Sequence, residues 1–219
     1  MRSGGEVALL LLNLDRFNTV NDVHGHPAGD QLLQLVAARL RRATRTGDLI
    51  TRLGGNEFAL VAPLDAAGHH RPPSEAAAQL ARRVIVALEQ PFELAGGTVA
   101  QIGASVGVAL AQPDGEDADT LMHRADVALY PAKAEGRERF HLFEPGMDAQ
   151  IRARVMLEGE LRRAIAEDAV VPHFQPPIEI ETERLIGFEM LARWPHPTLG
   201  MISSAEFILI TEDIGLIGR

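Results

Sequence analysis

Cysteine is absent from the 219-residue sequence, so neither a disulfide framework nor a thiolate metal site can form. Long hydrophobic runs are absent too: the longest, residues 7–12, falls far short of the roughly 20 residues that a membrane span needs. Residues 1–6 carry no apolar stretch typical of a signal peptide. A net charge of −9 argues against general binding of nucleic acids or anionic membranes. We therefore expect a cytoplasmic protein that needs only a local basic pocket to bind an anionic nucleotide.

The first two thirds of the sequence alternate between strand and helix patterns. Residues 7–12 form a fully apolar run, which indicates a strand buried on both faces. Residues 30–42 carry apolar side chains at the helical period, and residues 49–53 and 57–62 flank a glycine-rich turn, which is typical of a hairpin. Further along we expect a helix over 74–90, a second hairpin with a long strand over 99–110, a helix over 117–134 and a closing strand over 139–143. This order predicts an α/β sandwich with a mixed central sheet.

The composition changes after residue 144. Residues 148–167 have the pattern of a charged amphipathic helix, residues 170–180 and 184–191 are interpreted as two strands, and residues 203–212 as a further helix. We divide the chain into a domain over 1–144, a linker helix over 145–169 and a small region over 170–219. That last region is too small to bury its own apolar strands.

Three polar stretches have the composition of ligand sites. The first is the end of the buried strand at Asn13, which leads into a loop with two glycines, and such strand ends are common metal and nucleotide sites. The second is the turn at residues 54–57, where backbone can approach a phosphate beside one carboxylate. The third is the pair Lys133 and Arg137 near a helix C-terminus. Taken singly, each also fits an ordinary strand end, hairpin turn or basic helix end.

Together, in this order and spacing, these stretches resemble the GGDEF family of diguanylate cyclases. The family motifs run D-x-D-x-F-K-x-x-N-D, G-H-x-x-G-D, R-x-x-D, GG(D/E)EF and A-D-x-A-L-Y-x-A-K-x-x-G-R. The chain has N-L-D-R-F-N-T-V-N-D, G-H-P-A-G-D, R-T-G-D, G-G-N-E-F and A-D-V-A-L-Y-P-A-K-A-E-G-R. The resemblance covers nearly all of residues 7–143 and implies the GGDEF-type α/β sandwich.

The resemblance also implies a nucleotide substrate and an arrangement of subunits. GTP is the family substrate and cyclic-di-GMP its product, made by two subunits that each hold one GTP. By position, Asn21 and Asp30 match the residues that hold the guanine edge. Lys133 and Arg137 match those that hold the triphosphate.

The signature turn departs from the family at its metal ligands. Gly54 and Gly55 are kept, and Glu57 matches the acidic residue beside the reacting 3′-hydroxyl. However, Asn13 replaces the first Asp of D-x-D, and Asn56 replaces the acidic third residue of the turn. Mg²⁺ prefers anionic oxygen ligands, and both replacements are neutral amides. We therefore expect weak or absent Mg²⁺ binding and loss of turnover, with GTP binding kept because two charges no longer repel the triphosphate.

Arg45 and Asp48 stand where the family has its inhibitory R-x-x-D site for cyclic-di-GMP. An Arg fork can pair with a phosphate or a guanine edge, and an Asp can accept from guanine N–H groups. The tetrapeptide by itself equally fits a surface Arg–Asp pair in a turn. His69 and His70 are adjacent and have no third ligand near them in the sequence, so we interpret them as loop residues.

A second resemblance begins after residue 170. The segments F-Q-P at 174–176 and G-F-E-M-L-A-R-W at 187–194 resemble the start of an EAL domain, a barrel that hydrolyses cyclic-di-GMP. Glu189 matches the signature metal-binding glutamate, Leu191 the signature leucine, and Arg193 a residue facing the substrate phosphate. The family's remaining metal ligands and general base lie in later strands. We therefore expect an incomplete (β/α) barrel start without phosphodiesterase activity.

These resemblances favour a regulatory module of a GGDEF–EAL protein that binds GTP, cyclic-di-GMP or both. One alternative is a weakly active diguanylate cyclase that still uses Glu57. Others are a fragment of a cyclic-di-GMP phosphodiesterase and a structural dimerisation domain without ligands. Because the barrel strands would present unpaired edges and an apolar face, we also expect a homodimer.

Overall fold

A computed structural model describes residues 6–64, 72–111, 115 and 117–217, and His69 and His70 lie outside this part of the chain. The chain divides into two units, Met1–Asp148 and Ala149–Arg219. The helix expected as a linker falls almost wholly in the second unit. None of the helices in the described residues is long and apolar enough to cross a bilayer.

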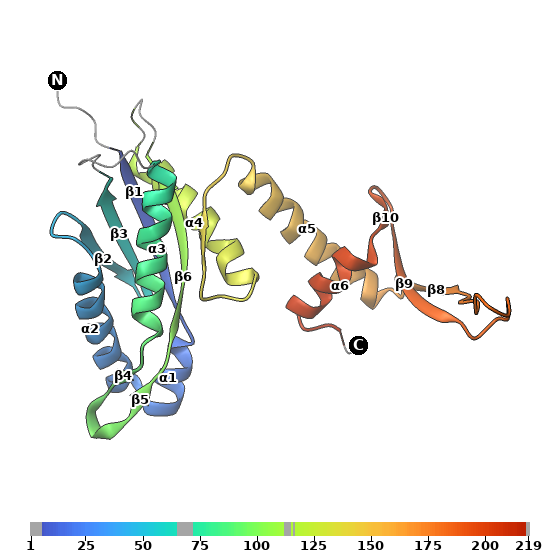
Figure 1. Cartoon of the computed structure of the whole chain (residues 1–219), viewed down its shortest axis with the longest axis horizontal. Coiled ribbons are helices and arrows are strands. Elements are labelled where there is room, and N and C mark those ends of the chain that lie inside the picture. Colours follow the sequence, from blue (N-terminus) through green and yellow to red (C-terminus); the bar gives the residue numbers. More distant parts are fainter. Residues whose placement is uncertain (1–5, 65–71, 112–114, 116, 218–219) are drawn as a thin grey trace. The chain divides into compact units, whose positions relative to one another are not determined.

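A five-stranded sheet forms the middle of the first unit (Figure 1). Its strand order is β2 (Leu49–Gly54), β3 (Glu57–Pro63), β1 (Val7–Asp15), β6 (Gly103–Leu110) and β7 (Phe140–Leu142). β1 pairs antiparallel with β3 and β6, whereas β6 and β7 run parallel. The mixed sheet predicted from the sequence is therefore confirmed.

β1 is buried on both faces because helices cover the sheet on both sides. Leu10 and Leu12 share one core with residues of α2 (His26–Ala43) and α3 (Pro73–Glu89). Leu9 and Leu11 share a second core with Ala125 and Leu129 of α4 (Ala118–Ala134). A strand covered in this way has no solvent face, so its apolar run is continuous rather than alternating. The result is an α/β sandwich of three layers.

α4 approaches the sheet through Gly107 of β6. A Cβ atom on this glycine would lie 2.0 Å from the backbone oxygen of Ala125 and 2.4 Å from the backbone nitrogen of Leu129. The N-terminus of α4 is capped by Asp117, whose Oδ1 accepts the backbone N–H of Thr120 at 2.8 Å. This hydrogen bond lowers the pKa of Asp117. Helix α4 thus packs closely on β6 in its middle, and its first turn is closed by a cap within the helix itself.

Two elements of the first unit differ from the sequence-based expectations. A short helix, α1 (Phe17–His24), precedes α2 and was not predicted. The strand expected over 99–110 is two strands: β5 (Val99–Ala100) pairs only with β4 (Phe92–Glu93), and β6 begins at Gly103. Val99 is exposed, but the apolar residues from Ala100 to Ala109 are buried, so the hydrophobic pattern continues where the hydrogen bonding does not.

The second unit is a three-stranded antiparallel sheet with two helices, α5 (Met147–Ala166) and α6 (Ser204–Asp213). Its strand order is β10 (Gly200–Ile202), β9 (Glu189–His196) and β8 (Val171–Gln175). β9 starts later than the predicted 184–191 strand. Residues 184–188 are mostly loop, with one bridge from Leu185 to Ile178. No closed barrel is formed.

A small core holds the second unit together. Leu157 and Leu161 of α5 pack with Trp194 and Phe207, whose rings meet edge to face at 6.1 Å. The side chain of His196 is almost fully buried, and its Nε2 lies 3.0 Å from Glu160 Oε2 of α5. Helix α5 therefore supplies part of this core and not only a connection.

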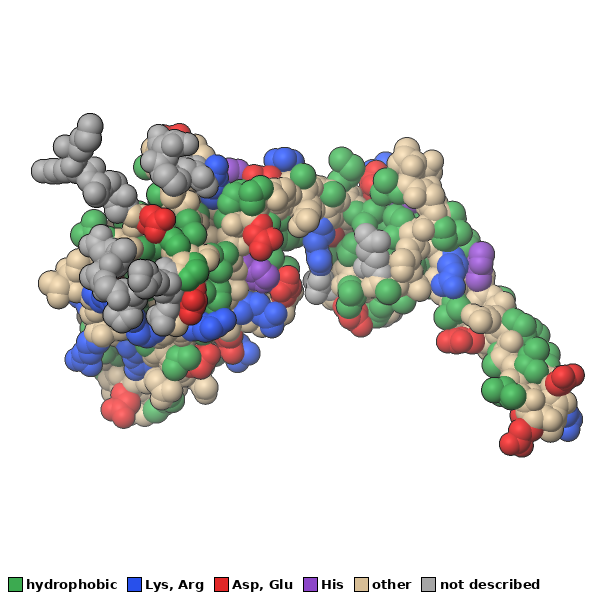
Figure 2. Space-filling model, turned by 45° about the horizontal axis from the view of Figure 1, so that its top comes forward, with side chains coloured by type: hydrophobic (Ala, Val, Ile, Leu, Met, Phe, Trp, Pro, Cys, Tyr) green, Lys and Arg blue, Asp and Glu red, His purple; other side chains and the backbone are tan. Residues whose placement is uncertain are grey.

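The hairpin between β8 and β9 carries large hydrophobic side chains that this core does not cover. Figure 2 shows hydrophobic surface along this hairpin. More than half of each of the following side chains is exposed: Phe174, Ile178, Ile180, Leu185, Ile186, Phe188 and Met190. So extended an apolar surface is unusual for an isolated monomer.

We expect Gly107→Ala to destabilise the first unit, because the added methyl group would push α4 away from β6. Overpacking of this kind costs about 1–3 kcal/mol. The control is Gly47→Ala, since no atom lies within 4 Å of its Cβ position. Urea unfolding followed by circular dichroism measures both variants. Equal midpoints for the two would show that α4 does not pack on β6 as described.

Candidate functional site

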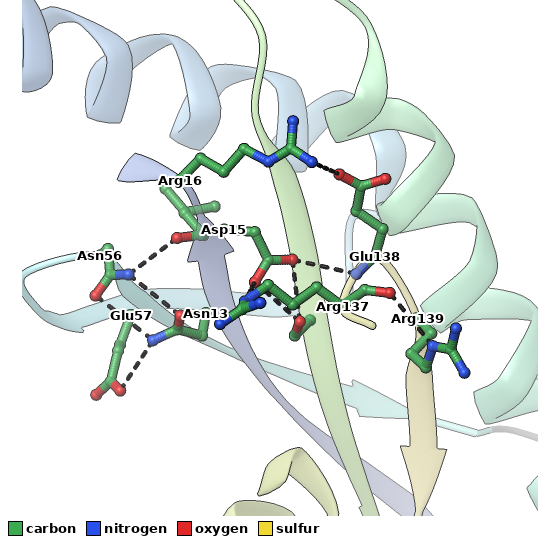
Figure 3. A network of polar contacts seen from close by, with 10 residues as sticks. Asn13, Asp15, Arg16, Asn56, Glu57, Arg137, Glu138 and Arg139 are labelled. Atoms are coloured by element: carbon green, nitrogen blue, oxygen red, sulfur yellow. Dashed lines mark hydrogen bonds and ion pairs between the residues drawn. The ribbon is translucent and has the colours of Figure 1, made fainter. Parts of the chain in front are cut away.

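Two asparagine side chains face each other where β1 ends. Asn56 Nδ2 donates to Asn13 Oδ1 at 3.2 Å, and Asn13 Nδ2 lies 3.5 Å from Asn56 Oδ1. Asn56 Nδ2 also donates to the carbonyl of Leu14 at 2.9 Å, and the Leu14 N–H donates to the carbonyl of Asn56 at 3.0 Å. These contacts form the amide pair, Asn13 and Asn56, which joins β1 to the turn between β2 and β3 (Figure 3).

The turn beside the amide pair leaves its backbone open to solvent. No atom lies within 4 Å of a Cβ position on Gly54 or Gly55, and Gly55 has a positive φ of 48°. The Arg52 guanidinium donates twice to the Gly55 carbonyl, at 3.0 and 2.8 Å, which holds the turn in place. Glu57 is exposed and accepts from Asn13 Nδ2 at 3.3 Å. The structure therefore brings the predicted turn residues together around one carboxylate.

Asp15, two residues after Asn13, is a buried carboxylate that the sequence analysis did not single out. Only 3% of its surface is exposed. Ser105 Oγ lies 3.0 Å from both carboxylate oxygens, and the Glu138 N–H donates to Oδ2 at 3.2 Å. Arg137 Nε lies 3.9 Å from Oδ1. Asp15 thus ties together β1, β6 and the loop that follows α4 (Figure 3).

The loop after α4 has an uncommon backbone. Gly136, Arg137 and Glu138 are left-handed, with φ of 116°, 62° and 53°. Arg16, at the start of α1, also has a positive φ of 61°, and its Nη2 lies 3.9 Å from Glu138 Oε1. These four residues line a cavity of about 300 Å³. The motif comparison predicted only Arg137 among them.

The remaining predicted GTP-binding residues lie on three helices. The Asn21 side chain of α1 packs on Gly29 of α2, where a Cβ atom would come within 1.9 Å of Asn21 Oδ1. Asp30 follows on α2 and is exposed. Lys133 lies in the last turn of α4, whereas Arg137 lies beyond the helix end. In the described part of the chain, no hydrogen bond or ion pair joins Asn21, Asp30 or Lys133 to the amide pair or to Asp15.

Arg45 and Asp48 form a tight turn between α2 and β2. Asp48 Oδ2 accepts the backbone N–H of Arg45 at 2.8 Å, and the Asp48 N–H donates to the Arg45 carbonyl at 3.0 Å. Among the described residues, no hydrogen bond or ion pair engages the exposed Arg45 guanidinium. The pair is thus joined through the Arg45 backbone, which differs from the side-chain ion pair that a surface Arg–Asp turn suggests.

The EAL-like residues lie on β9 of the second unit. Glu189, Leu191 and Arg193 alternate along the strand and pair with Gln175, His173 and Val171 of β8. Glu189 is exposed at the start of the strand. Arg193 Nη1 lies 3.4 Å from Ser204 Oγ.

No described residues form a cluster of three or more His, Asp or Glu side chains that could hold a metal ion. At the end of β1, the side chains that meet are two amides and Glu57, while Asp15 is occupied by Ser105 and the Glu138 N–H. The donor set at the predicted metal position is therefore one carboxylate and two neutral groups.

Comparison with known families matches residues 1–139 to the diguanylate cyclase, GGDEF domain, and residues 158–219 to the EAL domain. The bifunctional diguanylate cyclase/cyclic di-GMP phosphodiesterase MucR of Pseudomonas aeruginosa is 39% identical over 217 residues, covering 99% of this chain and 30% of MucR. The cyclic di-GMP phosphodiesterase PdeR of Escherichia coli is 34% identical over 212 residues, covering 97% of this chain and 31% of PdeR. The chain spans less than a third of the length of these two relatives.

Solved structures show the same fold for the first unit. The GGDEF domain of YfiN (TpbB) from Pseudomonas aeruginosa has a TM-score of 0.61 at 33% identity, covering 68% of this chain and 83% of that one. The GGDEF domain of DgcB from Caulobacter crescentus, in complex with c-di-GMP, has a TM-score of 0.55 at 30% identity, covering 64% and 78%.

Proposed function

The chain belongs to the diguanylate cyclase GGDEF family and continues into the EAL family, and from this membership we propose that its first unit binds GTP for regulation without converting it. The observation that carries the proposal is the amide pair, Asn13 and Asn56. Both side chains stand where the family motif has metal-binding carboxylates. The chain would then act in cyclic-di-GMP signalling as a sensor of nucleotide.

The amide pair is a poor ligand set for Mg²⁺. An amide nitrogen only donates hydrogen bonds, and the Asn56 nitrogen is directed at Asn13 Oδ1 and the Leu14 carbonyl. An amide oxygen can touch a cation but cannot neutralise it, and Mg²⁺ gives up its waters reluctantly. Among the described residues, Glu57 is the one carboxylate hydrogen-bonded to the pair. The residues present therefore do not fit the family's metal.

Binding of GTP does not require that metal. Two carboxylates near a triphosphate would repel it unless a cation lay between them, and the amides remove this repulsion. Lys133 and Arg137 supply positive charge, and the open backbone at Gly54 and Gly55 allows a phosphate to approach. Asn21 and Asp30 supply the groups for the guanine edge. The weakly active cyclase remains the alternative, because Glu57 is exposed beside the same turn.

We expect the chain to form no cyclic-di-GMP from GTP with Mg²⁺ or Mn²⁺. Combining Asn13→Asp with Asn56→Asp should place three carboxylates together, so that the variant melts at a lower temperature without Mg²⁺ and regains stability and GTP affinity with it. Thermal melting and calorimetry with and without Mg²⁺ measure these effects.

The control for added charge is Gln34→Glu with Gln150→Glu, two exposed positions, which should show no response to Mg²⁺. Turnover of the natural chain at roughly 1 per second or faster, an ordinary enzyme rate, would contradict the proposal. A lack of Mg²⁺ response in the aspartate variant would show that the two positions do not form the metal site.

We further propose that Arg45 and Asp48 bind cyclic-di-GMP. The related DgcB domain was solved with this nucleotide, which supports the proposal. Because Asp48 holds the Arg45 backbone, the guanidinium stays free to meet a ligand. The turn is therefore organised before any nucleotide arrives, which reduces the entropy lost on binding.

Replacing Arg45 by Ala should weaken cyclic-di-GMP binding by about 1.5–3 kcal/mol, the scale of a charged hydrogen bond. Arg45→Lys keeps the charge but loses the planar fork, so it should give an intermediate affinity. GTP affinity should stay the same in both variants, and calorimetry measures both ligands. Should all three proteins bind cyclic-di-GMP equally, Arg45 and Asp48 are only a surface turn.

The third part of the proposal is that two chains associate through the exposed hydrophobic hairpin of the second unit. Ile180 and Phe188 are exposed there by 94% and 66%. Two such faces can cover each other in a symmetric dimer, because each copy offers the same patch. A homodimer also matches the two-subunit arrangement that the GGDEF resemblance implies.

Light scattering should find the full chain as a dimer or larger species, and a shortened chain ending at Phe143 as a smaller one. In the full chain, Ile180→Glu with Phe188→Glu should shift the equilibrium to monomers, since two charges would be buried at the contact. Val23→Glu with Val86→Glu introduces equal charges at exposed sites of the first unit and should leave the dimer intact. A monomeric natural chain would exclude this contact.

A further inference from the structure

Arg16 is a charged residue at the cavity, and the proposed binding of GTP and cyclic-di-GMP gives it no part. Its side chain is 71% exposed, and it lies with Gly136, Arg137 and Glu138 around the cavity of about 300 Å³. Its only ion pair within the described residues is with Glu138, at 3.9 Å. At this distance and exposure an ion pair is worth little, so the Arg16 guanidinium is available to a stronger partner.

Three residues that line the cavity have a strained backbone. Arg16, Arg137 and Glu138 are left-handed although none is glycine, at a cost of roughly 1–2 kcal/mol each. Such conformations persist only where the surroundings enforce them, and they concentrate at ligand clamps and active sites. Here the buried Asp15 enforces the loop by accepting the Glu138 N–H. Figure 3 shows the two arginines on either side of Asp15 and Glu138.

The two acids that face these arginines differ in their freedom to move. Asp15 is buried and held by Ser105 and a backbone N–H, so it remains beside Arg137. The Glu138 side chain is 44% exposed, and its one ion pair in the described part of the chain is with Arg16. An incoming anion would therefore displace Glu138 and leave Asp15 in place.

We propose that Arg16 is a further phosphate-binding residue of the first unit, held by Glu138 until an anion enters the cavity and then transferred to that anion. The ligand class is the phosphate chain of a nucleoside triphosphate, and the inference rests on the proposed binding of GTP. Arg16 and Arg137 then present two planar forks to one polyphosphate, each able to bind two oxygens. Glu138 turns to solvent once the anion has bound, and until then it competes only weakly for Arg16.

The test is calorimetry of the full chain without Mg²⁺, using GTP and inorganic tripolyphosphate as separate probes. Arg16→Asn is the variant of choice because asparagine tolerates a left-handed backbone, so the fold is kept. It should bind both probes at least about tenfold more weakly, the loss of one charged hydrogen bond. Glu138→Gln should bind both up to about fivefold more tightly, since a surface ion pair no longer competes. In the combined variant this gain should shrink.

Arg162→Ala removes an exposed arginine of the second unit and should bind both probes as the natural chain does. If Arg16→Asn melts and binds both probes like the natural chain, the phosphate role of Arg16 is overturned and the GTP module stands. If tripolyphosphate binding depends on Arg16 but GTP binds no more tightly than tripolyphosphate, the phosphate role of Arg16 stands and the proposed GTP-binding function fails. A natural chain that binds neither probe overturns both, and tighter binding by Arg16→Asn overturns the competition with Glu138.

Discussion

The burial of β1 on both faces is the constraint on which the rest of the first unit depends. Since helices cover each side of the sheet, a slide of β1 by one residue would move every apolar side chain into the opposite core, where its neighbours are packed for a different side chain. Its last residues are therefore fixed in space, and Asn13, Asp15 and Arg16 each begin a separate interaction there. The amide pair, the buried carboxylate and the cavity all follow from the end of one strand.

Much of this arrangement could be predicted from local sequence. The apolar run at residues 7–12 predicts a central strand, and the glycines before Asn56 predict the hairpin turn that meets it. The family motif then relates Asn13 to Asn56, although 43 residues separate them. Their hydrogen bonding to each other follows from the β1–β3 register, which places Asn13 opposite Glu57. Sequence patterns succeed here because strand periodicity and turn chemistry are local.

Asp15 and its partners could not be predicted in the same way. Ser105 and Glu138 lie 90 and 123 residues further along the chain, and neither carries a pattern that indicates a buried acceptor nearby. The left-handed backbone at Arg137 and Glu138 could not be predicted from the sequence either, because the usual signal for it is glycine or asparagine. In the second unit, the apolar residues before β9 predicted a strand. They are exposed and form a loop, and the sequence pattern does not show whether an apolar residue is packed. In each case the missing information is tertiary.

The left-handed residues have a consequence for how this chain can vary. Branching at Cβ is incompatible with that backbone, so Val, Ile and Thr are excluded at positions 16, 137 and 138. Glycine would adopt this backbone with the least strain at each position, yet the chain carries two arginines and a glutamate there. Among homologous chains, we therefore expect these three positions to hold mainly glycine, asparagine, aspartate or other residues without branching at Cβ. A change from arginine to glycine would relieve the backbone strain and remove the positive charge at the cavity.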